Sequence, residues 1–500
     1  MRNLSKSKLL AYRQCPKRLW LEIHKPELRE DSSATQASFA IGNKVGDIAR
    51  SLYDPTGKGQ LINPQVEGFS AAFARSKALL SGANPIFEAG FAAEGALAFA
   101  DVMLPVQADG DPAWRMIEVK SSTSVKDYHR DDVAIQAYVA RSSGVALNAI
   151  SLAHINTQWV YPGDDDYRGL LKEHDLSSEA FSRAEEVKGW IAAAQDIAAN
   201  TTEPEIDTGH HCNDPFACGF LNYCNREKVQ AEYPVTWLPR IQAKALKTLI
   251  EVEGIGDMRD VPDKLLNARQ RRVKTHTLNN EIYFDAPGAV ADLSIHPLPG
   301  YFLDFETIQF AVPIWKGTRP YQQIPFQFSL HRLSRENELD QKSFLDLSGN
   351  DPSRAFAESL IAACDESGPV FVYNAGFETA RIRELAARFP PLKIPLLAIN
   401  ARVVDLLRVA EKHYYHPQQQ GSWSIKKVLP AVAPDLSYET LDGVQNGGMA
   451  MEAFLEAIAS TTTGTRKAEI EKQLITYCGL DTFAMVRLWQ FFSGHGSPAH

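Results

Sequence analysis

The sequence predicts an α/β protein with at least two domains, and three observations support this fold class. The chain has 500 residues, whereas a single hydrophobic core rarely organises more than about 250–300 residues. Strand-like and helical stretches alternate along both halves of the chain instead of gathering in separate regions. Hydrophobic residues account for 44% and charged residues for 23% of the chain, which is the composition of an ordinary soluble globular protein.

Composition and charge exclude several classes of protein. No run of about 18 apolar residues occurs, so we expect no membrane span and no membrane partner. The N-terminal stretch MRNLSKSKLLAYRQCPKRLW lacks the apolar core of a secretory signal, which favours a cytoplasmic location. The net charge of −9 argues against a histone-like protein that coats nucleic acid. It does not exclude a nuclease, because a nuclease site concentrates carboxylates around metal ions.

Changes of pattern along the chain divide it into three regions. We expect an α/β domain over residues 1–230, a helical connector over 231–295 and a second α/β domain over 296–500. In the first region the patterns are helical near 5–22, 36–52, 130–143 and 178–199, and strand-like near 86–91, 97–106 and 114–120.

The connector combines predicted helices with basic side chains, namely Lys244, Lys247, Arg269, Arg271, Arg272 and Lys274. A strand-like stretch, HTLNNEIYF, follows them. The segment LIEVEGIGDMRDV is similar to a helix-hairpin-helix, whose backbone N–H groups can contact a phosphate; the alternative is a plain helical hairpin. The run NARQRRVKTH either follows a nucleic-acid backbone or forms a solvated helix face.

Two strand-like stretches of the first region carry charged residues that suit a metal ion. In WRMIEVKSS, Glu118 and Lys120 are two residues apart and therefore share one face of a strand. Asp101 lies in LAFADVMLP, a second apolar strand. Oxygen ligands from Asp101 and Glu118 suit Mg²⁺ or Mn²⁺, and Lys120 would polarise the attacking water and offset charge on a phosphate. The alternative is a pair of strands whose charged residues simply face solvent.

This spacing resembles the PD-(D/E)xK nucleases, specifically the RecB-like branch with its restriction-endonuclease-like fold. The resemblance implies Asp101 and Glu118 as catalytic metal ligands, Lys120 as the catalytic lysine and Gln136 as an accessory residue on the next helix. Glu88, in IFEAGF, takes the place of the family's upstream acidic metal ligand. The chain departs from the family twice. The early helix AIGNKVGDIAR has no metal-binding His, and a Tyr follows Gln136 by two residues instead of four.

Four of the six cysteines fall in two segments. Cys15 lies in YRQCPKRLW, and Cys212, Cys218 and Cys224 lie in HCNDPFACGFLNYC. Because a reducing compartment disfavours structural disulfides, clustered cysteines indicate a metal site. One early cysteine and a late triplet resemble the iron–sulfur nucleases of the CRISPR-adaptation exonuclease and AddB type. That resemblance implies one [4Fe–4S] cluster that ties the N-terminal helix to the end of the domain.

Zinc is the physical alternative at these cysteines. Four thiolates also suit a tetrahedral Zn²⁺, and His210 or His211 could replace one of them. The five-residue gaps between the late cysteines nevertheless differ from the close C-x₂₋₄-C pairs that are usual in zinc sites. Cys364 and Cys478 stand alone, and we expect ordinary core residues there.

A second set of carboxylates lies in the C-terminal region. PLPGYFLDFETI predicts an apolar strand in which Asp304 and Glu306 share one face. Burying both is costly unless a cation neutralises them. PVFVYNAGFETARIREL predicts a strand, a turn and a helix that begins near Glu378. In the helical KQLITYCGLDTFAMVRLW, Tyr477 and Asp481 are four residues apart and share a face.

A strand D-x-E, then N-x-x-F-[DE], then a helical Y-x-x-x-D resemble the DEDD exonucleases of the DnaQ-like class, which have an RNase H-like fold. The resemblance implies two metal ions about 3.5–4 Å apart, with the two strand carboxylates, Glu378 and Asp481 as ligands and Tyr477 positioning the water. The family usually has Asp at the Glu378 position, and Asp405 in ARVVDLLRV is the substitute candidate. RPYQQIPFQFSLH resembles an uncharacterised bacterial domain that is fused behind RecB-like nucleases.

The leading expectation is an enzyme that hydrolyses phosphodiester bonds of nucleic acid, foremost DNA, at two separate Mg²⁺ or Mn²⁺ sites, in repair, recombination or defence. A second expectation is a nucleic-acid-binding protein in which one nuclease-like domain is degenerate and only grips the polymer; Glu378 and the missing helical His favour it. A third is a metal-dependent hydrolase of nucleotides, which a substrate panel with and without Mn²⁺ would distinguish.

Overall fold

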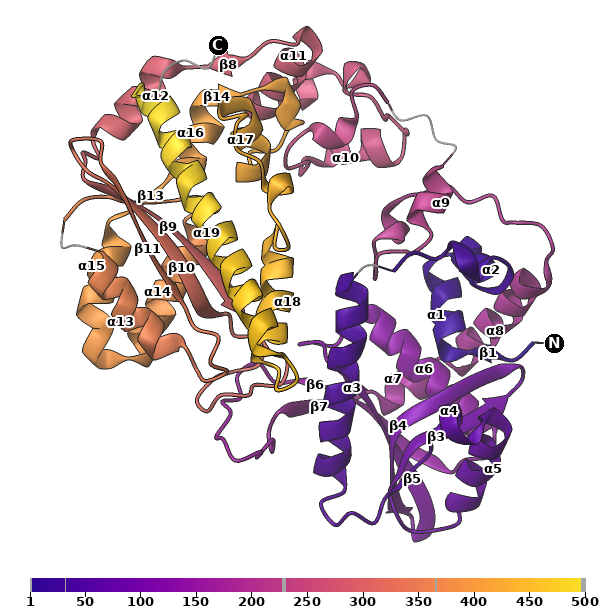
Figure 1. Ribbon diagram of the computed structural model, residues 1–500. Coiled ribbons are helices and arrows are strands. Elements are labelled where there is room, and N and C mark those ends of the chain that lie inside the picture. The colour runs from indigo at the N-terminus through magenta and orange to yellow at the C-terminus, as the bar shows by residue number, and fades with distance from the viewer. Residues whose placement is uncertain (1, 32, 227–230, 365–366, 496–500) are drawn as a thin grey trace. The chain divides into compact units, whose positions relative to one another are not determined.

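The computed structural model describes residues 2–31, 33–226, 231–364 and 367–495, which form two compact units (Figure 1). The first unit contains Met1–Lys228 and Phe310–Gln322, and the second contains Val229–Gln309 and Gln323–His500. Each unit combines a β-sheet with helices. The predicted α/β class is therefore confirmed.

The first unit is built around a seven-stranded sheet with the order β2-β3-β4-β5-β6-β7, in which β1 also pairs with β4. The strands β3, β4 and β5 form an antiparallel meander, β6 runs parallel to β5, and β7 is antiparallel to β6. A crossover helix, α6 (Asp127–Ser142), joins the parallel neighbours β5 and β6, as parallel pairing requires. The strand bounds are β1 Leu4–Ser5, β2 Gln60–Leu61, β3 Ile86–Ala93, β4 Ala96–Ala108, β5 Asp111–Lys120, β6 Leu147–Ile155 and β7 Leu171–Asp175.

Alternate residues of β5 pack into different cores. Trp114 and Met116 belong to the core that α6 covers, whereas Ile117 packs with apolar residues of the other face. Glu118 and Lys120 continue the first of these two rows, so they lie on the α6 face of the sheet. The other helices of this unit are α1 Lys6–Gln14, α2 Pro16–His24, α3 Ser33–Tyr53, α4 Pro64–Glu67, α5 Phe69–Leu79, α7 Ser177–Ser182, α8 Ala184–Ala199 and α9 Leu221–Asn225.

Residues 310–322 lie in the first unit, although the sequence had placed them within the second domain. Val312 is buried in one apolar cluster with Val45, Ile155 and Leu170. Backbone hydrogen bonds join the segment to Tyr161, whose N–H donates to the carbonyl of residue 318 at 2.9 Å and whose carbonyl accepts from the N–H of residue 317 at 2.8 Å. The segment is therefore an integral part of the first core.

The second unit contains a five-stranded sheet with the order β11-β10-β9-β12-β13. The pairs β9–β10 and β10–β11 are antiparallel, while β9–β12 and β12–β13 are parallel. The strand bounds are β9 Gly300–Ile308, β10 Ile324–Leu333, β11 Leu339–Leu345, β12 Val370–Val372 and β13 Val403–Asp405. The helices that follow β11 are α13 Ser353–Ala363, α14 Gly376–Arg388, α15 Lys393–Ala401, α16 Leu406–His413, α17 Ile425–Val432, α18 Gly447–Ile458 and α19 Gly464–Ser493.

Strand β9 separates two cores. Tyr301, Leu303 and Phe305 pack with α13, α14 and α15, whereas Phe302 packs with the C-terminal part of α19. Figure 1 shows the long helix α19, in yellow, running along the sheet. Because side chains alternate along a strand, the even-numbered residues that follow Phe302 also lie on the α19 face. This alternation brings two acidic side chains of β9 toward α19.

The segment 231–295, expected to be a separate connector, shares a hydrophobic core with α16, α17 and α19. It contains α10 Lys244–Glu251, α11 Ala268–Asn279 and α12 Ala286–Ser294, and its β8 (Tyr283–Phe284) pairs with β14 (Tyr414–Tyr415). The strand expected over HTLNNEIYF is wrong for its first four residues, because Asn267 caps α11 and the buried Val273 and Thr277 hold that helix on the core. The Gly-Ile-Gly turn leads from α10 into a short 3₁₀ turn, so it does not join two α-helices directly.

Basic side chains of α11 are engaged within the second unit. Arg269 forms an ion pair with Glu411 at 2.8 Å, and Arg272 donates to the carbonyl oxygen of Glu411 at 3.0 Å. Lys274 forms an ion pair with Asp263 at 2.8 Å. These three cations hold α11 on its neighbours, so contact with a nucleic-acid backbone is not needed to explain their positions.

Among the helices of the described residues, none has the length and apolarity for a membrane crossing.

Candidate functional site

Three carboxylates of the second unit converge. Asp304 and Glu306 on β9 and Asp481 on α19 each offer one oxygen, and these oxygens all lie within 4.8 Å of one another. Glu306 and Asp481 are buried, and Asp304 is partly buried. Across residues 2–31, 33–226, 231–364 and 367–495, no other set of three His, Cys, Asp or Glu ligands is as compact. The structure thus brings together three of the four metal ligands predicted for this domain.

Burial and like charge oppose the ionisation of this triad. Burial, followed by Asp481 and Glu306, raises the pKa of Asp304 well above its usual value. Burial and Asp481 raise the pKa of Glu306 to about 8, and burial raises the pKa of Asp481 to about 6. Adjacent buried carboxylates are costly to ionise together unless a cation lies between them. Three oxygen ligands in this arrangement suit a hard divalent ion.

Two tyrosines and a lysine surround Asp481. The hydroxyl of Tyr438 donates to Asp481 Oδ1 at 2.6 Å. Tyr477, one turn earlier on α19, also donates a hydrogen bond to Asp481. Lys426 Nζ lies 4.9 Å from the ring centre of Tyr438 and 5.6 Å from that of Tyr477. Its charge acts on Asp481 and Glu306 in the direction that favours their ionised forms.

Glu378 lies outside the triad, in the first turn of α14, but its charge acts on Asp304. Its side chain is buried, its Oε2 atom has no hydrogen-bond partner, and burial raises its pKa to about 8. Asp405 instead caps α16, where Oδ1 accepts from the N–H of Leu407 and of Asn374, each at 3.0 Å. Asp405 is therefore committed to the backbone, whereas Glu378 keeps an unused oxygen.

The first unit arranges a row of three acids across adjacent strands. The β3–β4 register, which pairs residues 87 with 102 and 89 with 100, places Glu88 across from Asp101. The β4–β5 register, which pairs residues 102 with 117, continues to place Asp101 beside Glu118. Asp101 Oδ2 accepts from the N–H of Val119 at 2.6 Å. Burial, followed by the charge of Glu118, raises the pKa of Asp101 well above its usual value. The sheet thus aligns the acids that the sequence predicted.

Two lysines form ion pairs with Glu118, the last acid of this row, and with Asp132 on α6. Lys120 Nζ lies 2.6 Å from Glu118 Oε1 and 2.6 Å from Asp132 Oδ2. Lys6 Nζ, from α1, lies 2.8 Å from Glu118 Oε1 and 3.4 Å from Asp132 Oδ1. Burial disfavours the charged form of Lys120, but Asp132 and Glu118 outweigh it and raise the pKa of Lys120 well above its usual value. Burial would raise the pKa of Asp132, but Lys120 and Lys6 hold it well below its usual range. The four groups form a cluster of alternating charge.

Gln136 on α6 completes this cluster. Its Nε2 donates to Glu118 Oε2 at 2.7 Å and to Asp132 Oδ1 at 2.9 Å, while its buried Oε1 has no partner. Tyr138, two residues further, donates to Glu94 instead. Gln136 therefore contacts both acids of this cluster, whereas the hydroxyl of Tyr138 bonds elsewhere.

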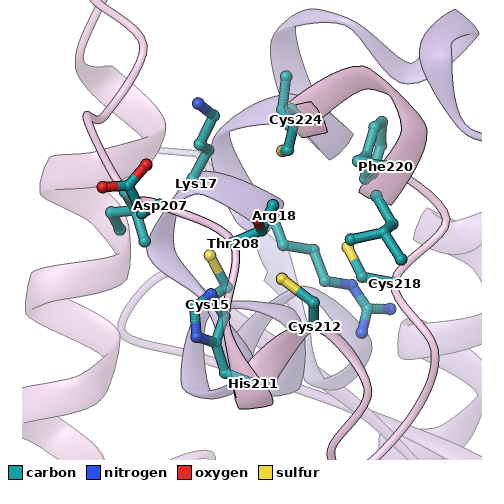
Figure 2. A pocket seen from close by; sticks show the side chains of 13 residues that line it. Cys15, Lys17, Arg18, Asp207, Thr208, His211, Cys212, Cys218, Phe220 and Cys224 are labelled. Carbon is teal, nitrogen blue, oxygen red and sulfur yellow. The ribbon is translucent and has the colours of Figure 1, made fainter. Parts of the chain in front are cut away.

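The four cysteines line one pocket of the first unit. Cys15 lies at the junction of α1 and α2, Cys212 in a 3₁₀ turn, Cys218 in a loop and Cys224 in α9. Figure 2 shows their side chains directed into the same space. Gln14, the last residue of α1, joins this helix to the segment that carries the later cysteines. Its Nε2 donates at 2.7 Å to the carbonyl oxygens of residues 211 and 216. His211 also lines the pocket, whereas His210 is largely exposed and lies near Asp214.

The four thiols share one pocket of the first unit but do not form a compact set. Burial raises the pKa of Cys218 and of Cys224, and Arg18 and Lys17 respectively act in the opposite direction. No three of the four sulfurs lie within 4.8 Å of one another in the described part of the chain. The sulfurs of a tetrahedral Zn²⁺ site, with Zn–S bonds of about 2.3 Å, would be about 3.8 Å apart. Cys364 and Cys478 are buried, as expected for core residues.

Sequence reasoning missed four residues of these sites. Asp132 precedes Gln136 by one helical turn, so its spacing alone could have indicated it. Lys6 reaches Glu118 only through the fold of α1, and Lys426 and Tyr438 come from loops and helices far from the motifs. For these the local sequence has no distinguishing signal.

Comparisons with known proteins match one family model and two uncharacterised relatives. Residues 301–424 match a domain of unknown function, DUF2779; this range includes all of β9 except its first residue, together with α14 and β13. The uncharacterized protein MG366 of Mycoplasma genitalium is 26% identical over 212 residues, which cover 38% of this chain and 31% of that protein. The uncharacterized MG366 homolog of Mycoplasma pneumoniae is 29% identical over 212 residues, with the same coverage of 38% and 31%. The chain spans about a third of the length of these relatives.

Proposed function

We propose that the protein is a metal-dependent nuclease that hydrolyses phosphodiester bonds of nucleic acid, foremost DNA, in two separate catalytic units. The observation that carries the proposal is the triad of Asp304, Glu306 and Asp481. Its oxygens lie within 4.8 Å of one another, and its carboxyl groups resist ionisation in the absence of a cation. Buried acids in this arrangement lower the stability of the metal-free fold, and their oxygens suit a divalent metal ion.

The architecture around the triad supports an RNase H-like exonuclease domain. The order β11-β10-β9-β12-β13, with an antiparallel first half and a parallel second half, is the order of RNase H-like sheets. In DEDD exonucleases the acids lie on the central strand, on the helix after the fourth strand and on the last helix. Asp304 and Glu306, Glu378, and Asp481 occupy those three positions here.

The residues of the second site have distinct roles in this proposal. A bound pair of Mg²⁺ or Mn²⁺ ions would supply water activation and neutralise charge on the phosphate. The triad would hold the ions, and the unpartnered Oε2 of Glu378 would provide a further ligand. Tyr477 would orient the attacking water through its hydroxyl. The water oxygen forms a bond to phosphorus, one P–O bond breaks, and the departing oxygen receives a proton.

The first unit supports a restriction-endonuclease-like nuclease in the same way. A meander of three strands, a crossover helix and a fourth strand parallel to the third form the core of that fold, as β3, β4, β5, α6 and β6 do here. Asp101 and Glu118 would hold a divalent ion. The ammonium of Lys120 would offset charge that develops on the phosphate, and the unpartnered Oε1 of Gln136 would accept from the attacking water.

The cysteine pocket supports a [4Fe–4S] cluster in the proposal. Cys15, Cys212, Cys218 and Cys224, which line one pocket, would hold it. A cluster contains four iron atoms and therefore holds its thiolates further apart than a single ion does. When bound, it would serve as a cross-link between segments 200 residues apart, rather than as part of the hydrolytic step.

A second candidate function follows from the first unit. In the described chain, the carboxylate oxygens of Glu88, Asp101 and Glu118 do not all lie within 4.8 Å of one another. Glu118 already forms an ion pair with Lys6. These observations favour a first unit that grips nucleic acid while only the second unit cuts. In that case the protein is a single-site nuclease with a binding domain.

The test uses one end-labelled DNA, as single strand and as duplex, in Mn²⁺. Asp304→Ala should abolish stepwise digestion from an end, and Lys120→Ala should abolish the remaining cleavage. Asp435→Ala, which removes an exposed carboxylate of an ion pair in the second unit, and Lys8→Ala, which removes a lysine of α1, serve as matched controls.

The outcomes separate the candidates. Full activity of the Asp304→Ala/Lys120→Ala double variant would refute the nuclease assignment at both sites. If Lys120→Ala cuts at the wild-type rate while Asp304→Ala cuts nothing, the second candidate replaces the first. The same panel with RNA and with free nucleotides identifies the substrate class.

A further inference from the structure

Lys6 contacts the carboxylate cluster of the first unit, but the proposed nuclease function assigns it no role. Its Nζ lies 2.8 Å from Glu118 Oε1, the oxygen that Lys120 also contacts at 2.6 Å. Its second contact is Asp132 Oδ1 at 3.4 Å. The side chain is 23% exposed, whereas both carboxylates are 1% exposed. A cation in this position competes with a metal ion for Glu118.

Helix α1 carries Lys6 at its first residue and ends at Gln14, with Cys15 as its C-cap. At the start, Leu4 and Ser5 pair with β4, and Ser5 caps the helix by accepting from the N–H of Lys8. At the end, the N–H of Cys15 bonds to the last turn, and the preceding Gln14 grips the loop of the cysteine pocket. Nine helical residues span about 14 Å. One rigid element therefore connects the cysteine pocket to the carboxylate cluster.

We propose that Lys6 is a positioning residue that sets the metal affinity of the first site, and that the cysteine pocket controls Lys6 through α1. This inference rests on the proposed nuclease function of the first unit. When the pocket is assembled, α1 holds the Lys6 ammonium on Glu118 and the site binds metal weakly. When the pocket is disrupted, α1 shifts, the ammonium withdraws, and Glu118 becomes available to metal.

The sign of the effect follows from charge. Glu88, Asp101, Glu118 and Asp132 contribute four carboxyl groups, and Lys6 and Lys120 contribute two ammonium groups. Removing the Lys6 ammonium, which lies 2.8 Å from Glu118 Oε1, strengthens the attraction for a dication and removes a competitor. We expect Lys6→Met to lower the dissociation constant for Mn²⁺ about tenfold, after discounting for relaxation of the site.

The experiment measures Mn²⁺ binding by electron paramagnetic resonance in the full chain carrying Asp304→Ala, so that only the first site is read. In this background, Lys6→Met should tighten binding about tenfold, while Lys8→Met, two residues along the same helix, should leave it unchanged. Cys15→Ser, Cys224→Ser and the milder Gln14→Ala should tighten binding in the same direction. Combining Lys6→Met with Cys15→Ser should add nothing beyond Lys6→Met, because both act through one group.

Each result decides a different point. If Lys6→Met changes the dissociation constant for Mn²⁺ by less than about twofold, the proposed role of Lys6 is wrong. Cysteine and Gln14 variants that leave binding unchanged, or that add in full to Lys6→Met, overturn control by the pocket. If the cysteine variants do not fold, Gln14→Ala alone decides. Absence of any Mn²⁺ binding in the Asp304→Ala protein overturns the metal site itself, and with it the first half of the proposed function.

Discussion

Glu306→Gln should remove part of the pH dependence of stability in the metal-free second unit. Burial and Asp481 raise the pKa of Glu306 from 4.5 to about 8. Because the folded pKa lies above the unfolded one, the folded state holds a proton that the unfolded state has lost between pH 4.5 and 8. The contribution to stability is complete below about pH 4.5 and is lost as pH rises through about 8.

The magnitude follows from linkage. One proton held only by the folded state changes the free energy of unfolding by about −1.4 kcal/mol for each unit of pH. Over the interval from 4.5 to about 8, Glu306 alone would cost the metal-free unit roughly 5 kcal/mol. Glu378, whose pKa burial also raises to about 8, adds its own slope. Gln cannot ionise, so Glu306→Gln should make the slope shallower by about 1.4 kcal/mol per pH unit.

Urea unfolding of metal-free protein at several values between pH 6 and 7.5 tests this, with hydrogen exchange of peptides from β9 and α19 reporting on the second unit. The control is Glu358→Gln, an exposed carboxylate of α13, which should leave the slope unchanged. Saturating Mn²⁺ should flatten the wild-type slope, because metal binding requires the ionised form. An identical slope in wild type and Glu306→Gln, or wild-type stability that rises with pH, would refute the reasoning.

Further outcomes are expected for metal, cluster and backbone. Binding of Mn²⁺ at pH 7 should release at least about two protons, roughly 0.9 from each of Glu306 and Glu378 and a further contribution from Asp304, whose pKa is also raised; titration calorimetry in buffers of different ionisation enthalpy counts them, and no release would contradict the raised pKa values. Anaerobically purified protein should be brown, and Cys218→Ala should remove both colour and iron; zinc without iron in elemental analysis would exclude the cluster. Gly421→Ala should destabilise the second unit by more than about 3 kcal/mol, because φ is +75° and a Cβ would lie 1.5 Å from the carbonyl oxygen of Trp237. Normal thermal unfolding of that variant would show the loop to be adaptable.

The sequence predicted those site residues whose relation is local. The pairs Asp304/Glu306 and Glu118/Lys120 follow from strand alternation, and Tyr477 reaches Asp481 through one helical turn. In each case spacing along one element decides which side chains share a face.

Contacts between distant elements could not be predicted in this way. Lys6 enters the first site because β1 pairs with β4, a pairing between residues 4–5 and 96–97. Tyr438 reaches Asp481 from a short turn with no periodic pattern. HTLNNEIYF has the alternation of a strand, but the cap at Asn267 and the burial of Val273 in the second core favour a helix. Tertiary contacts outweigh local preference there.

The inclusion of residues 310–322 in the first core has a consequence for the order of folding during synthesis. A ribosome that has released residues 1–228 has not yet made Val312, so Ile155 and Leu170 lack one of their apolar neighbours. The first unit can be completed only after β9, with two of the three converging carboxylates of the second unit, has also emerged. A gene fragment that ends near residue 230 should therefore give a poorly soluble product, and one that ends after residue 322 should expose β9 without β12.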